Sequence, residues 1–570
     1  MKKFLLIALF FVFAYGIPSI GRPMLKPDEF RYGEIAAEML QSRDFTTPRL
    51  LGGRYFEKPP LGYWVTAGAI RVFGRNAFAV RFMSLLGTAG AALLLAEWVR
   101  QSRRDNDLAA LAAILYLGSG LILGLGTVAV LDSLLCCFTT GTLGSVFLAL
   151  EERRFSRRRV FFGLLAGVFA GLAFLTKGFI AFVIPALTTA LYLVVERRWR
   201  EFLLLPPLLL PGVLAVSLPW ALRIHAAEPD FWRYFIVEEH WKRFTDGSDQ
   251  HPAPWWVLIP VLIGGSFPAA LMLSAVFGVE RDRWRALLRL PILRFAAAGV
   301  VMPLIFFSAS RGKLATYIAP CFAPLSVLMA AAVAAGMDGN KRFFHWVMTG
   351  WGYLLTVGGA GTMLFAGAIR LEVFAGRFPE LAGSGLFFGA LGAVACAGGV
   401  LMTVWKDRGW RTRFRFFWGT LAAGLATSAL LPDFNSGKMP AAMLTVLHER
   451  GRIDPKIDLV FAFPSSAHAV AWCIGESWTR VYASRGEFDY GDRAARQHGE
   501  EPLVWEREDL RRYAEDPRRR RPVVLISDDL RDLPKFMAKY PGLQRFESGE
   551  FIAWRLPPLP ERDRQPSSPR

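Results

Sequence analysis

The chain has 570 residues, of which 53% are hydrophobic and 20% are charged, and its formal net charge at pH 7 is +19. Repeated apolar runs of membrane-crossing length, separated by short charged stretches, exclude an ordinary soluble domain. The positive charge is spread over many short loops, which argues against nucleic-acid binding and fits topology signals and contacts with anionic lipids. Four of the five cysteines lie in apolar runs and Cys473 lies in a polar one, so neither a disulfide framework nor a zinc-finger spacing is indicated.

Thirteen membrane spans are predicted, which makes the chain a polytopic α-helical membrane protein. The first apolar run follows two lysines as a secretory signal would, but no small-residue cleavage site comes after it, so we interpret it as the first span. The predicted spans cover about 4–21, 83–100, 107–124, 127–149, 160–176, 178–195, 203–221, 255–279, 295–309, 314–336, 343–369, 383–405 and 415–431.

Loops of two kinds alternate between these spans. One set is short and rich in Arg and Lys, such as EERRFSRRR at 151–159, and is predicted to face the cytoplasm together with the N-terminus. The other set includes the long loops 22–82 and 222–254 and faces the opposite side, as does everything after residue 431. The unusual chemistry lies in this second set. An enzyme working there must take an activated substrate from the membrane, because nucleotide-activated substrates are cytoplasmic. Neither a Walker-type loop nor a GxGxxG element in a strand–helix context occurs, so no nucleotide cofactor is expected.

The C-terminal region predicts a small soluble α/β domain. Strand patterns occur in KIDLVFAF (456–463), RPVVLISDD (521–529) and GEFIAWRL (549–556), and helix patterns in AHAVAWCIGE (467–476) and DLPKFMAKY (532–540). We therefore expect a membrane domain at 1–431, an α/β domain at 432–558 and a disordered tail at 559–570.

The loop 22–82 contains two candidate site segments and two predicted interfacial helices, at about 29–41 and 60–73. In PDEFRYGEIAAEML (27–40), Asp28 is either a helix N-cap or a functional carboxylate, while Glu34 and Glu38 are expected on a solvated face. In RYFEKPPLGYW (54–64), two prolines restrict the backbone that carries Glu57 and Lys58, which form either an interfacial ion pair or part of a site.

Two further charges lie within apolar runs. Asp132 in VLDSLL marks either a functional carboxylate or the capped start of a helix near the interface. Lys177 in LTKGF is either functional or a lysine whose side chain extends to the interface.

The loop 222–254 holds three of the seven histidines, and its aromatic residues alternate with charges as in a helix lying in the headgroup zone. Glu239 and Arg243 share a helical face there. His240 could bind a divalent ion together with a carboxylate, although the ligand spacing matches no known signature.

The segment SASRGKLATY (308–317) places Arg311, Lys313 and Tyr317 between two spans, on the side where positive charge is disfavoured. Two cations beside Gly312 suit phosphate, since arginine binds it through two hydrogen bonds and glycine allows the backbone to approach. Ordinary loop charge is the alternative. Cations together with carboxylates indicate a lipid phosphate that carries a sugar or an amine.

Eight segments, in chain order, resemble the lipid A 4-amino-4-deoxy-L-arabinose transferases, a branch of the protein O-mannosyltransferase-like superfamily. They are PDEFRYGEIAAEML, LLGGRYFEKPPLGYW, VLDSLL, LTKGF, FWRYFIVEEHWKRF, QHPAPWWVLIPVLIGGSFP, FFSASRGKLATY and LPDFNSGKMP. The chain departs from the family pattern at Phe30, Pro60 and Arg311, where Thr, a non-proline residue and Lys are frequent. Because of these departures, the resemblance indicates the type of reaction better than it indicates which sugar is transferred.

The resemblance implies thirteen spans, a periplasmic α/β domain and a site at the periplasmic face of the bacterial inner membrane. The donor would be 4-amino-4-deoxy-L-arabinose on undecaprenyl phosphate and the acceptor a phosphate of lipid A, which reduces binding of polymyxin and other cationic peptides. A monomer is expected. The alternatives are another polyprenyl-phosphate sugar transferase with a protein or glycan acceptor, and a lipid flippase, which should show inverted repeats and broken helices.

The residues and the resemblance together give a hypothesis for the site. Asp28, Lys58 and Asp132 are predicted to be catalytic. Glu57 and His240 are predicted to hold a divalent ion, which the resemblance implies is zinc. Substrate binding is predicted for Arg31, Tyr55, Lys177, Arg243, Arg311, Lys313 and Tyr317.

Overall fold

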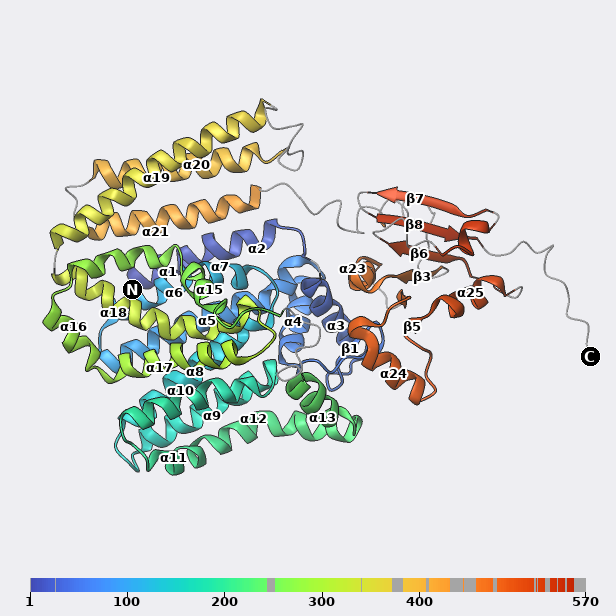
Figure 1. The fold of residues 1–570 in the computed structure, drawn as a ribbon, viewed down its shortest axis with the longest axis horizontal. Coiled ribbons are helices and arrows are strands. Elements are labelled where there is room, and N and C mark those ends of the chain that lie inside the picture. The colour runs from blue at the N-terminus through green and yellow to red at the C-terminus, as the bar shows by residue number, and fades with distance from the viewer. Residues whose placement is uncertain are drawn as a thin grey trace, which may run out of the picture. The chain divides into compact units, whose positions relative to one another are not determined.

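The structure is a computed structural model. It describes residues 2–25, 27–242, 252–339, 341–371, 383–405, 410–430, 444, 458–474, 479–516, 519, 521–527, 534–540, 542–548 and 551–557. The chain divides into two compact units (Figure 1). The helical unit comprises Met1–Arg22 and Arg81–Pro432, and the mixed unit comprises Pro23–Val80 and Asp433–Arg570. The predicted division assigned the loop 22–82 to the membrane domain, whereas nearly all of it belongs to the mixed unit.

The helical unit is built from apolar helices of very different lengths. Its α-helices are α1 (Lys2–Phe11), α2 (Ile17–Gly21), α5 (Ala77–Arg103), α6 (Asn106–Leu117), α7 (Gly120–Thr127), α8 (Leu131–Glu151), α9 (Arg157–Lys177), α10 (Ile180–Val195), α11 (Glu201–Leu204), α12 (Pro206–Ala227), α13 (Phe231–Arg233), α15 (Leu258–Gly265), α16 (Arg281–Leu288), α17 (Pro291–Ala309), α18 (Phe322–Gly339), α19 (Lys341–Arg370), α20 (Gly385–Val404) and α21 (Trp410–Ala426). Among its described residues are also five π or 3-10 segments: η1 (Val12–Gly16), η2 (Tyr234–Lys242), η3 (Ala269–Gly278), η4 (Ala315–Cys321) and η7 (Thr427–Leu430).

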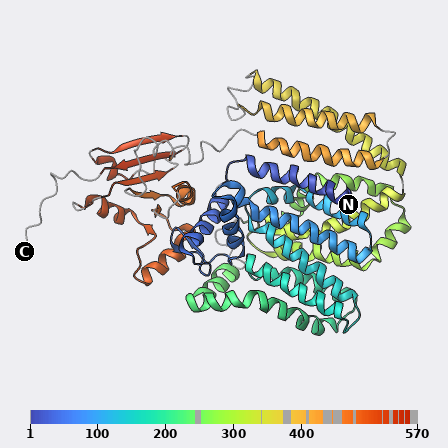
Figure 2. The same ribbon diagram turned by 180° about the vertical axis from the view of Figure 1, so that it is seen from behind.

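Nine helices in the described ranges are long and apolar enough to cross a membrane. Large apolar side chains on α19 face outward, as lipid contact requires: Trp346 is 71% exposed and Leu364 is 77% exposed. Helices α19 and α20 lie side by side in both views (Figures 1 and 2). The protein is therefore a polytopic membrane protein, while the count of thirteen crossings stays a prediction.

Two of the predicted spans are broken in the middle. The span expected at 107–124 divides into α6 and α7 around Ser119, and the span expected at 255–279 divides into α15 and η3 before Pro268. The two breaks satisfy each other's backbone groups, since Gly120 N–H donates to Phe267 O at 2.6 Å and Ala269 N–H donates to Gly118 O at 3.2 Å. A break in an apolar helix is tolerated when other protein groups pair its backbone in this way.

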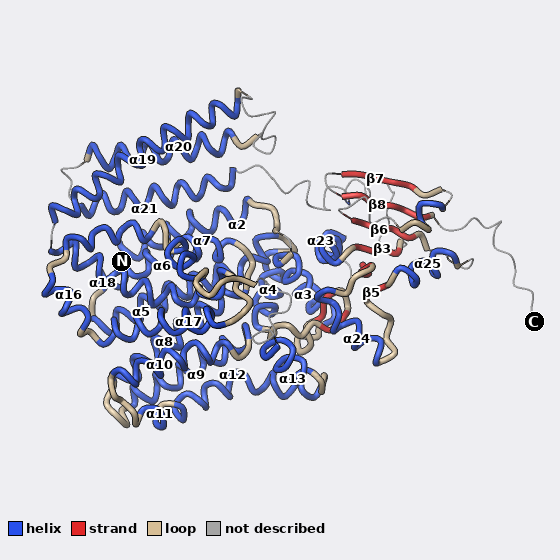
Figure 3. Tube along the Cα trace, viewed as in Figure 1, coloured by secondary structure: helices blue, strands red, loops and turns tan. Residues whose placement is uncertain are grey.

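The mixed unit contains a six-stranded sheet in the order β5-β4-β3-β6-β8-β7 (Figure 3). The four strands from β5 to β6 run parallel, and β8 and β7 pair antiparallel at one edge. The strands are β3 (Leu459–Ala462), β4 (Thr479–Tyr482), β5 (Val504–Trp505), β6 (Val523–Ser527), β7 (Gln544–Ser548) and β8 (Phe551–Leu556). Helices α23 (Pro464–Ile474), α24 (Asp489–Gln497) and α25 (Arg507–Glu515) and the 3-10 turns η9 (Gly486–Phe488) and η11 (Met537–Lys539) connect them.

The predicted α/β character is confirmed, with one error and several omissions. The three predicted strands correspond to β3, β6 and β8, and the helix predicted at 467–476 corresponds to α23. The helix predicted at 532–540 is wrong, because the described part forms only a short 3-10 turn. Tyr540 precedes a proline and is extended, with φ −76° and ψ 128°, as the following ring requires. Strands β4, β5 and β7 and helices α24 and α25 were not predicted. The tail 559–570 lies outside the described residues.

The first part of the mixed unit consists of α3 (Asp28–Ser42), a hairpin of β1 (Arg49–Leu50) and β2 (Gly53–Arg54), and α4 (Leu61–Phe73). The two helices predicted at 29–41 and 60–73 are thus confirmed as helices. They share one apolar core with the sheet, which explains why residues 23–80 join this unit. Residues of that core from both parts include Ile35, Met39, Leu50, Tyr63, Val460, Ala462, Val470 and Phe551.

The solvated face predicted for Glu34 and Glu38 is wrong, because both side chains are buried. Glu34 pairs with Arg75 at 2.7 Å, and Glu38 accepts backbone hydrogen bonds from Leu51 at 2.5 Å and Gly52 at 2.9 Å. Burial raises the pKa of Glu34 to about 7, with Arg75 opposing the rise. Burial, with Glu34 nearby, raises the pKa of Glu38 to about 8. Helix α3, which packs against α4 and α23, therefore carries these acidic residues inward.

Candidate functional site

Asp28 lies in the first turn of α3 and does not act as its N-cap, which corrects one of the two interpretations of this residue. The N-cap position belongs to Pro27, which is already helical with φ −88° and ψ −26°. The Asp28 carboxylate is 43% exposed and pairs with Arg31 Nη1 at 3.1 Å, one turn along the helix. A carboxylate at this end of a helix is favoured by the helix dipole.

Arg31 connects α3 to a second acidic residue, which sequence reasoning did not identify. Its Nε lies 2.6 Å from Glu487 Oε2 in η9, and the two side chains are 16% and 18% exposed. Glu487 Oε1 lies 2.6 Å from Nε2 of His468, a buried residue of α23. Burial raises the pKa of Glu487, but the hydrogen bond and charge of His468, followed by Arg31, outweigh burial and lower it overall. Nothing in the local sequence signals this pairing.

Tyr55, Glu57 and Lys58 follow the hairpin and precede α4. Tyr55 is 3% exposed, and burial, followed by the charge of Glu57, raises the pKa of its phenol, while Arg31 opposes the rise. Lys58 Nζ donates to the backbone carbonyl of Glu57 at 2.8 Å. Pro60 caps α4 with helical φ and ψ, so the prolines fix the backbone that carries these side chains.

Three predicted site residues meet inside the helical unit. Asp132 lies in the first turn of α8 and pairs with Lys177, the last residue of α9, at 2.7 Å, and the two side chains are 11% and 17% exposed. Lys177 Nζ also lies 5.7 Å from the ring centroid of Tyr317 in η4. Gly178 follows with φ +78°, which glycine adopts without strain and which ends α9 directly after the lysine. The ammonium group of Lys177 thus pairs with the buried carboxylate of Asp132.

His240 lies on the π-helix η2, near the same end of α9. Its Nδ1 lies 2.7 Å from the backbone oxygen of Phe235, and its ring packs edge-on against Phe179 and Phe235. This contact assigns the proton to Nδ1 in the neutral ring and leaves the lone pair on Nε2. Arg243 lies outside the described residues, and so its predicted role stays a prediction.

Arg311 and Lys313 differ in environment although they are two residues apart. Both line an open recess of about 680 Å³ with Pro252, Trp255 and Ser308. Arg311 is exposed. Lys313 is 8% exposed, and its ammonium donates to Ala253 O at 3.0 Å and also to Ser310 O. Lys313 therefore holds the loop together, and Arg311 presents its charge to the recess.

The metal prediction joins Glu57 of the mixed unit to His240 of the helical unit, and it stays a prediction. Within the described ranges, the His, Cys, Asp and Glu side chains form no group of three or more suited to a metal ion. A zinc site uses three or four protein ligands.

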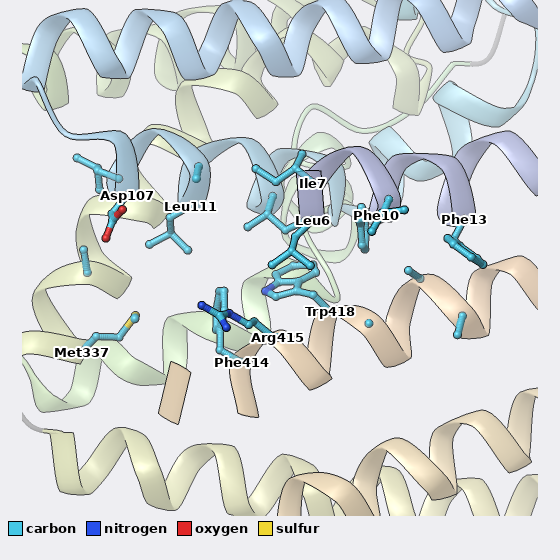
Figure 4. Close-up of a pocket in the computed structure, with 18 of the residues that line it drawn as sticks. Leu6, Ile7, Phe10, Phe13, Asp107, Leu111, Met337, Phe414, Arg415 and Trp418 are labelled. Carbon is cyan, nitrogen blue, oxygen red and sulfur yellow. The ribbon is translucent and has the colours of Figure 1, made fainter. Parts of the chain in front are cut away.

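A large apolar pocket of the helical unit holds none of the predicted site residues. It encloses about 630 Å³ and is lined mainly by side chains of α1, α6, α18 and α21. Phe10, Phe13 and Trp418 line one part of it, and Asp107 and Arg415 provide charge elsewhere on its wall (Figure 4). Its lining suits an acyl chain, whereas the candidate chemistry lies at Asp132, Lys177 and Arg311.

A protein family and two crystal structures indicate the class to which this protein belongs. The dolichyl-phosphate-mannose-protein mannosyltransferase family matches residues 1–235. Crystal structures of ArnT from Cupriavidus metallidurans, with undecaprenyl phosphate bound and in the apo state, have the same fold. Their TM-scores are 0.81 and 0.80, at 20% identity over 97% of both chains. The protein therefore has the fold of a multi-pass membrane protein of the ArnT type.

Relatives with similar sequences show the particular family to which the chain belongs. Undecaprenyl phosphate-alpha-4-amino-4-deoxy-L-arabinose arabinosyl transferases from Pectobacterium carotovorum and Pectobacterium atrosepticum are 34% and 35% identical, over 86% of this chain and of each relative. The protein of that name from Yersinia enterocolitica is 40% identical over 57% of this chain and 58% of its own length. The chain belongs to the family of undecaprenyl phosphate-aminoarabinose arabinosyl transferases.

Proposed function

We propose that the protein transfers 4-amino-4-deoxy-L-arabinose from undecaprenyl phosphate to a phosphate group of lipid A. The observation that carries this proposal is the similarity to transferases named for this donor over 86% of both chains. Adding an amino sugar to lipid A masks negative charge, so the reaction would reduce the binding of polymyxin and other cationic peptides.

The reaction takes place at the periplasmic face of the bacterial inner membrane in this proposal. The short loops rich in Arg and Lys support a cytoplasmic position for one side of the bundle. The loops that carry Lys58 and Arg311 belong to the opposite set, and Asp132 lies in the first turn of α8. A lipid-linked donor fits that side, because it needs no soluble nucleotide sugar.

The chemistry requires little proton transfer from the protein. A lipid A phosphate oxygen forms a bond to the anomeric carbon of the sugar, and the bond from that carbon to undecaprenyl phosphate breaks. Undecaprenyl phosphate leaves with the electron pair. Because the attacking phosphate is already anionic, the protein's task is to position the reactants and to stabilise the departing phosphate.

The charge of each candidate residue indicates the group of the substrates that it would bind. Lys58, Arg243 and Arg311 would bind phosphate groups, and Asp28 would orient the acceptor or the sugar. Lys177 is held by Asp132 at 2.7 Å, so it would offer a fixed positive charge. Asp132 would also accept the ammonium of the amino sugar. Tyr317 would form a hydrogen-bonding wall beside this pair, and Lys313 would support the loop of Arg311.

Mass spectrometry of lipid A incubated with donor lipid and purified protein tests the proposal. Wild-type protein should add one aminopentose, and the Asp28→Asn and Lys58→Ala variants should lose about 10²-fold or more in rate. Glu501→Gln, which changes an exposed ion pair with Arg480, serves as the matched control. Wild-type rates in both site variants would remove Asp28 and Lys58 from the site. Movement of the donor lipid without its consumption would indicate a flippase.

A second candidate function is transfer from a polyprenyl phosphate to a protein acceptor. The match of residues 1–235 to protein mannosyltransferases favours this candidate. Offering a peptide acceptor and lipid A in the same assay separates the two, because only the true acceptor gains the sugar mass.

A further inference from the structure

Four ionisable side chains of the mixed unit form a continuous chain that ends at a candidate catalytic carboxylate. His468 Nε2 lies 2.6 Å from Glu487 Oε1, and Glu487 Oε2 lies 2.6 Å from Arg31 Nε. Arg31 Nη1 lies 3.1 Å from Asp28 Oδ1. Residues more than 400 positions apart in the sequence thus meet in one row, which couples the α/β sheet region to the first turn of α3.

The chain is buried at its start and open at its end. His468 is 1% exposed, the side chains of Glu487 and Arg31 are 18% and 16% exposed, and the side chain of Asp28 is 43% exposed. A guanidinium group is planar and rigid, so an ion pair at Nε restricts the direction of Nη1. Glu487 thereby limits where Arg31 can hold the Asp28 carboxylate.

His468 in turn fixes Glu487. Its imidazole packs parallel to the ring of Phe488, with the ring centroids 5.5 Å apart and the planes 26° apart. It also lies on α23, a helix of the shared apolar core. The orientation of the carboxylate is therefore set by a residue that cannot move without disturbing the sheet.

Anchoring alone does not account for this row of charges. The shared apolar core already joins residues 23–80 to the sheet, and buried ion pairs often contribute no more stability than apolar residues of similar size. A row of ions that reaches an accessible carboxylate is instead suited to hold that carboxylate in one orientation.

We propose that Glu487 is a positioning residue of the transferase, which acts through Arg31 to hold Asp28 in its reactive orientation, and that His468 fixes Glu487. The α/β domain then takes part in the transfer reaction without touching the substrate. This inference rests on the proposed function of Asp28.

Steady-state kinetics of full-length protein with donor lipid and lipid A tests the inference. Glu487→Gln keeps the size of the side chain but removes its charge, and it should lower kcat about 10-fold or more, while KM for lipid A changes less than about 3-fold. His468→Ala should lower kcat in the same way. His468→Gln should recover part of the loss, because its amide can still donate to Glu487. Glu501→Gln should match wild type.

A double-mutant cycle separates positioning from a structural role. In the Asp28→Asn background, Glu487→Gln should change the residual kcat less than 2-fold, since the group that it positions has lost its function. If Asp28→Asn turnover falls below detection, the Arg31→Lys background gives the same comparison. An equal fold-loss in both backgrounds, or a wild-type kcat in Glu487→Gln, would overturn the inference.

The outcomes distinguish this inference from the proposed function. If wild-type protein adds no aminopentose to lipid A, the proposed function fails. If Asp28→Asn transfers sugar at the wild-type rate, the role of Asp28 fails and the positioning inference fails with it. If Asp28→Asn loses activity while Glu487→Gln and His468→Ala do not, only the positioning inference fails.

Discussion

Charged side chains are buried in both units, but their partners differ. In the helical unit, the buried Asp132 pairs with one opposite charge, and the buried Arg81 donates to backbone carbonyls. Lys177 pairs with Asp132 at 2.7 Å, and Arg81, which is fully buried, donates to Ser19 O at 3.0 Å and Arg22 O at 2.7 Å. Helices surrounded by lipid offer few other polar groups, so each charge needs its own local partner.

In the mixed unit the buried charges are shared among several elements. Arg75 pairs with Glu34 on α3 at 2.7 Å, donates to Trp472 O at 3.0 Å and stacks over the ring of Trp472 at 4.3 Å. Networks of this kind require three elements to be packed at once. Loss of a buried charge should therefore act locally in the helical unit, whereas in the mixed unit it should loosen several elements.

The largest effect is expected from breaking the pair inside the helical unit. Lys177→Met leaves Asp132 as an unpaired carboxylate among apolar helices, and we expect a loss of about 3–5 kcal/mol in stability and of about 10²-fold in transfer rate. Thermal unfolding and lipid A mass spectrometry measure the two losses. The double variant Asp132→Asn/Lys177→Met should recover the stability but not the rate. Recovery of both would show that the pair is only structural.

A slightly smaller effect is expected in the mixed unit from Arg75→Met, which leaves Glu34 buried without its cation. Stability should fall by about 3 kcal/mol. Protease cleavage within residues 23–80 should increase, because the arginine also bonds to α23. The double variant Glu34→Gln/Arg75→Met should restore resistance to the protease. Unchanged cleavage in the single variant would contradict the shared role of Arg75.

Stability of the mixed unit should depend on pH because of Glu34 and Glu38. Their folded-state pKa values, about 7 and about 8, lie above the ordinary value of 4.5. The folded state therefore binds these protons more tightly than the unfolded state does. The stabilisation is complete below about pH 4.5 and is lost as pH rises through 7 and 8, by about 3–5 kcal/mol for each carboxyl group. Melting temperatures at pH 5.5 and 8.5 measure it, and the double variant Glu34→Gln/Glu38→Gln should show a flatter profile.

The smallest effect is expected from an exposed ion pair of the mixed unit. Arg54 binds Glu500 through two hydrogen bonds, at 3.0 and 3.1 Å, but the glutamate side chain is 48% exposed. Glu500→Gln should cost less than about 1 kcal/mol and leave the transfer rate unchanged, because water and salt screen such pairs. A loss of stability as large as that of Arg75→Met would contradict the expected difference between buried networks and surface ion pairs.

The candidate site was predictable from the sequence wherever a charge stood out from its surroundings. Asp132 and Lys177 interrupt apolar runs, and an ion in such a run needs a partner. The prediction could not name that partner, because the two residues lie on different helices 45 positions apart. Glu487 and His468 gave no signal at all, since a carboxylate and a histidine in a polar region are ordinary.

The burial of Glu34 and Glu38 shows a case in which the local sequence gave a wrong prediction. An acidic residue at helical spacing predicts a solvated face when the helix is considered alone. Helices α4 and α23 pack against α3, and Arg75 and the backbone N–H groups of Leu51 and Gly52 satisfy the two carboxylates there. The local pattern correctly predicted a helix. The residues that bury its acidic side chains lie outside the helix, so the sequence of the helix alone could not indicate them.

The sequence by itself determined the class of the protein, its apolar helices and the charged residues that its chemistry needs, because hydropathy and local spacing are properties of neighbouring residues. The tertiary structure alone decided that residues 23–80 share a core with the sheet, that Lys177 meets Asp132, and that Glu487 reaches Asp28 through Arg31. These contacts join distant segments, and only packing in three dimensions brings such segments within the range of an ion pair.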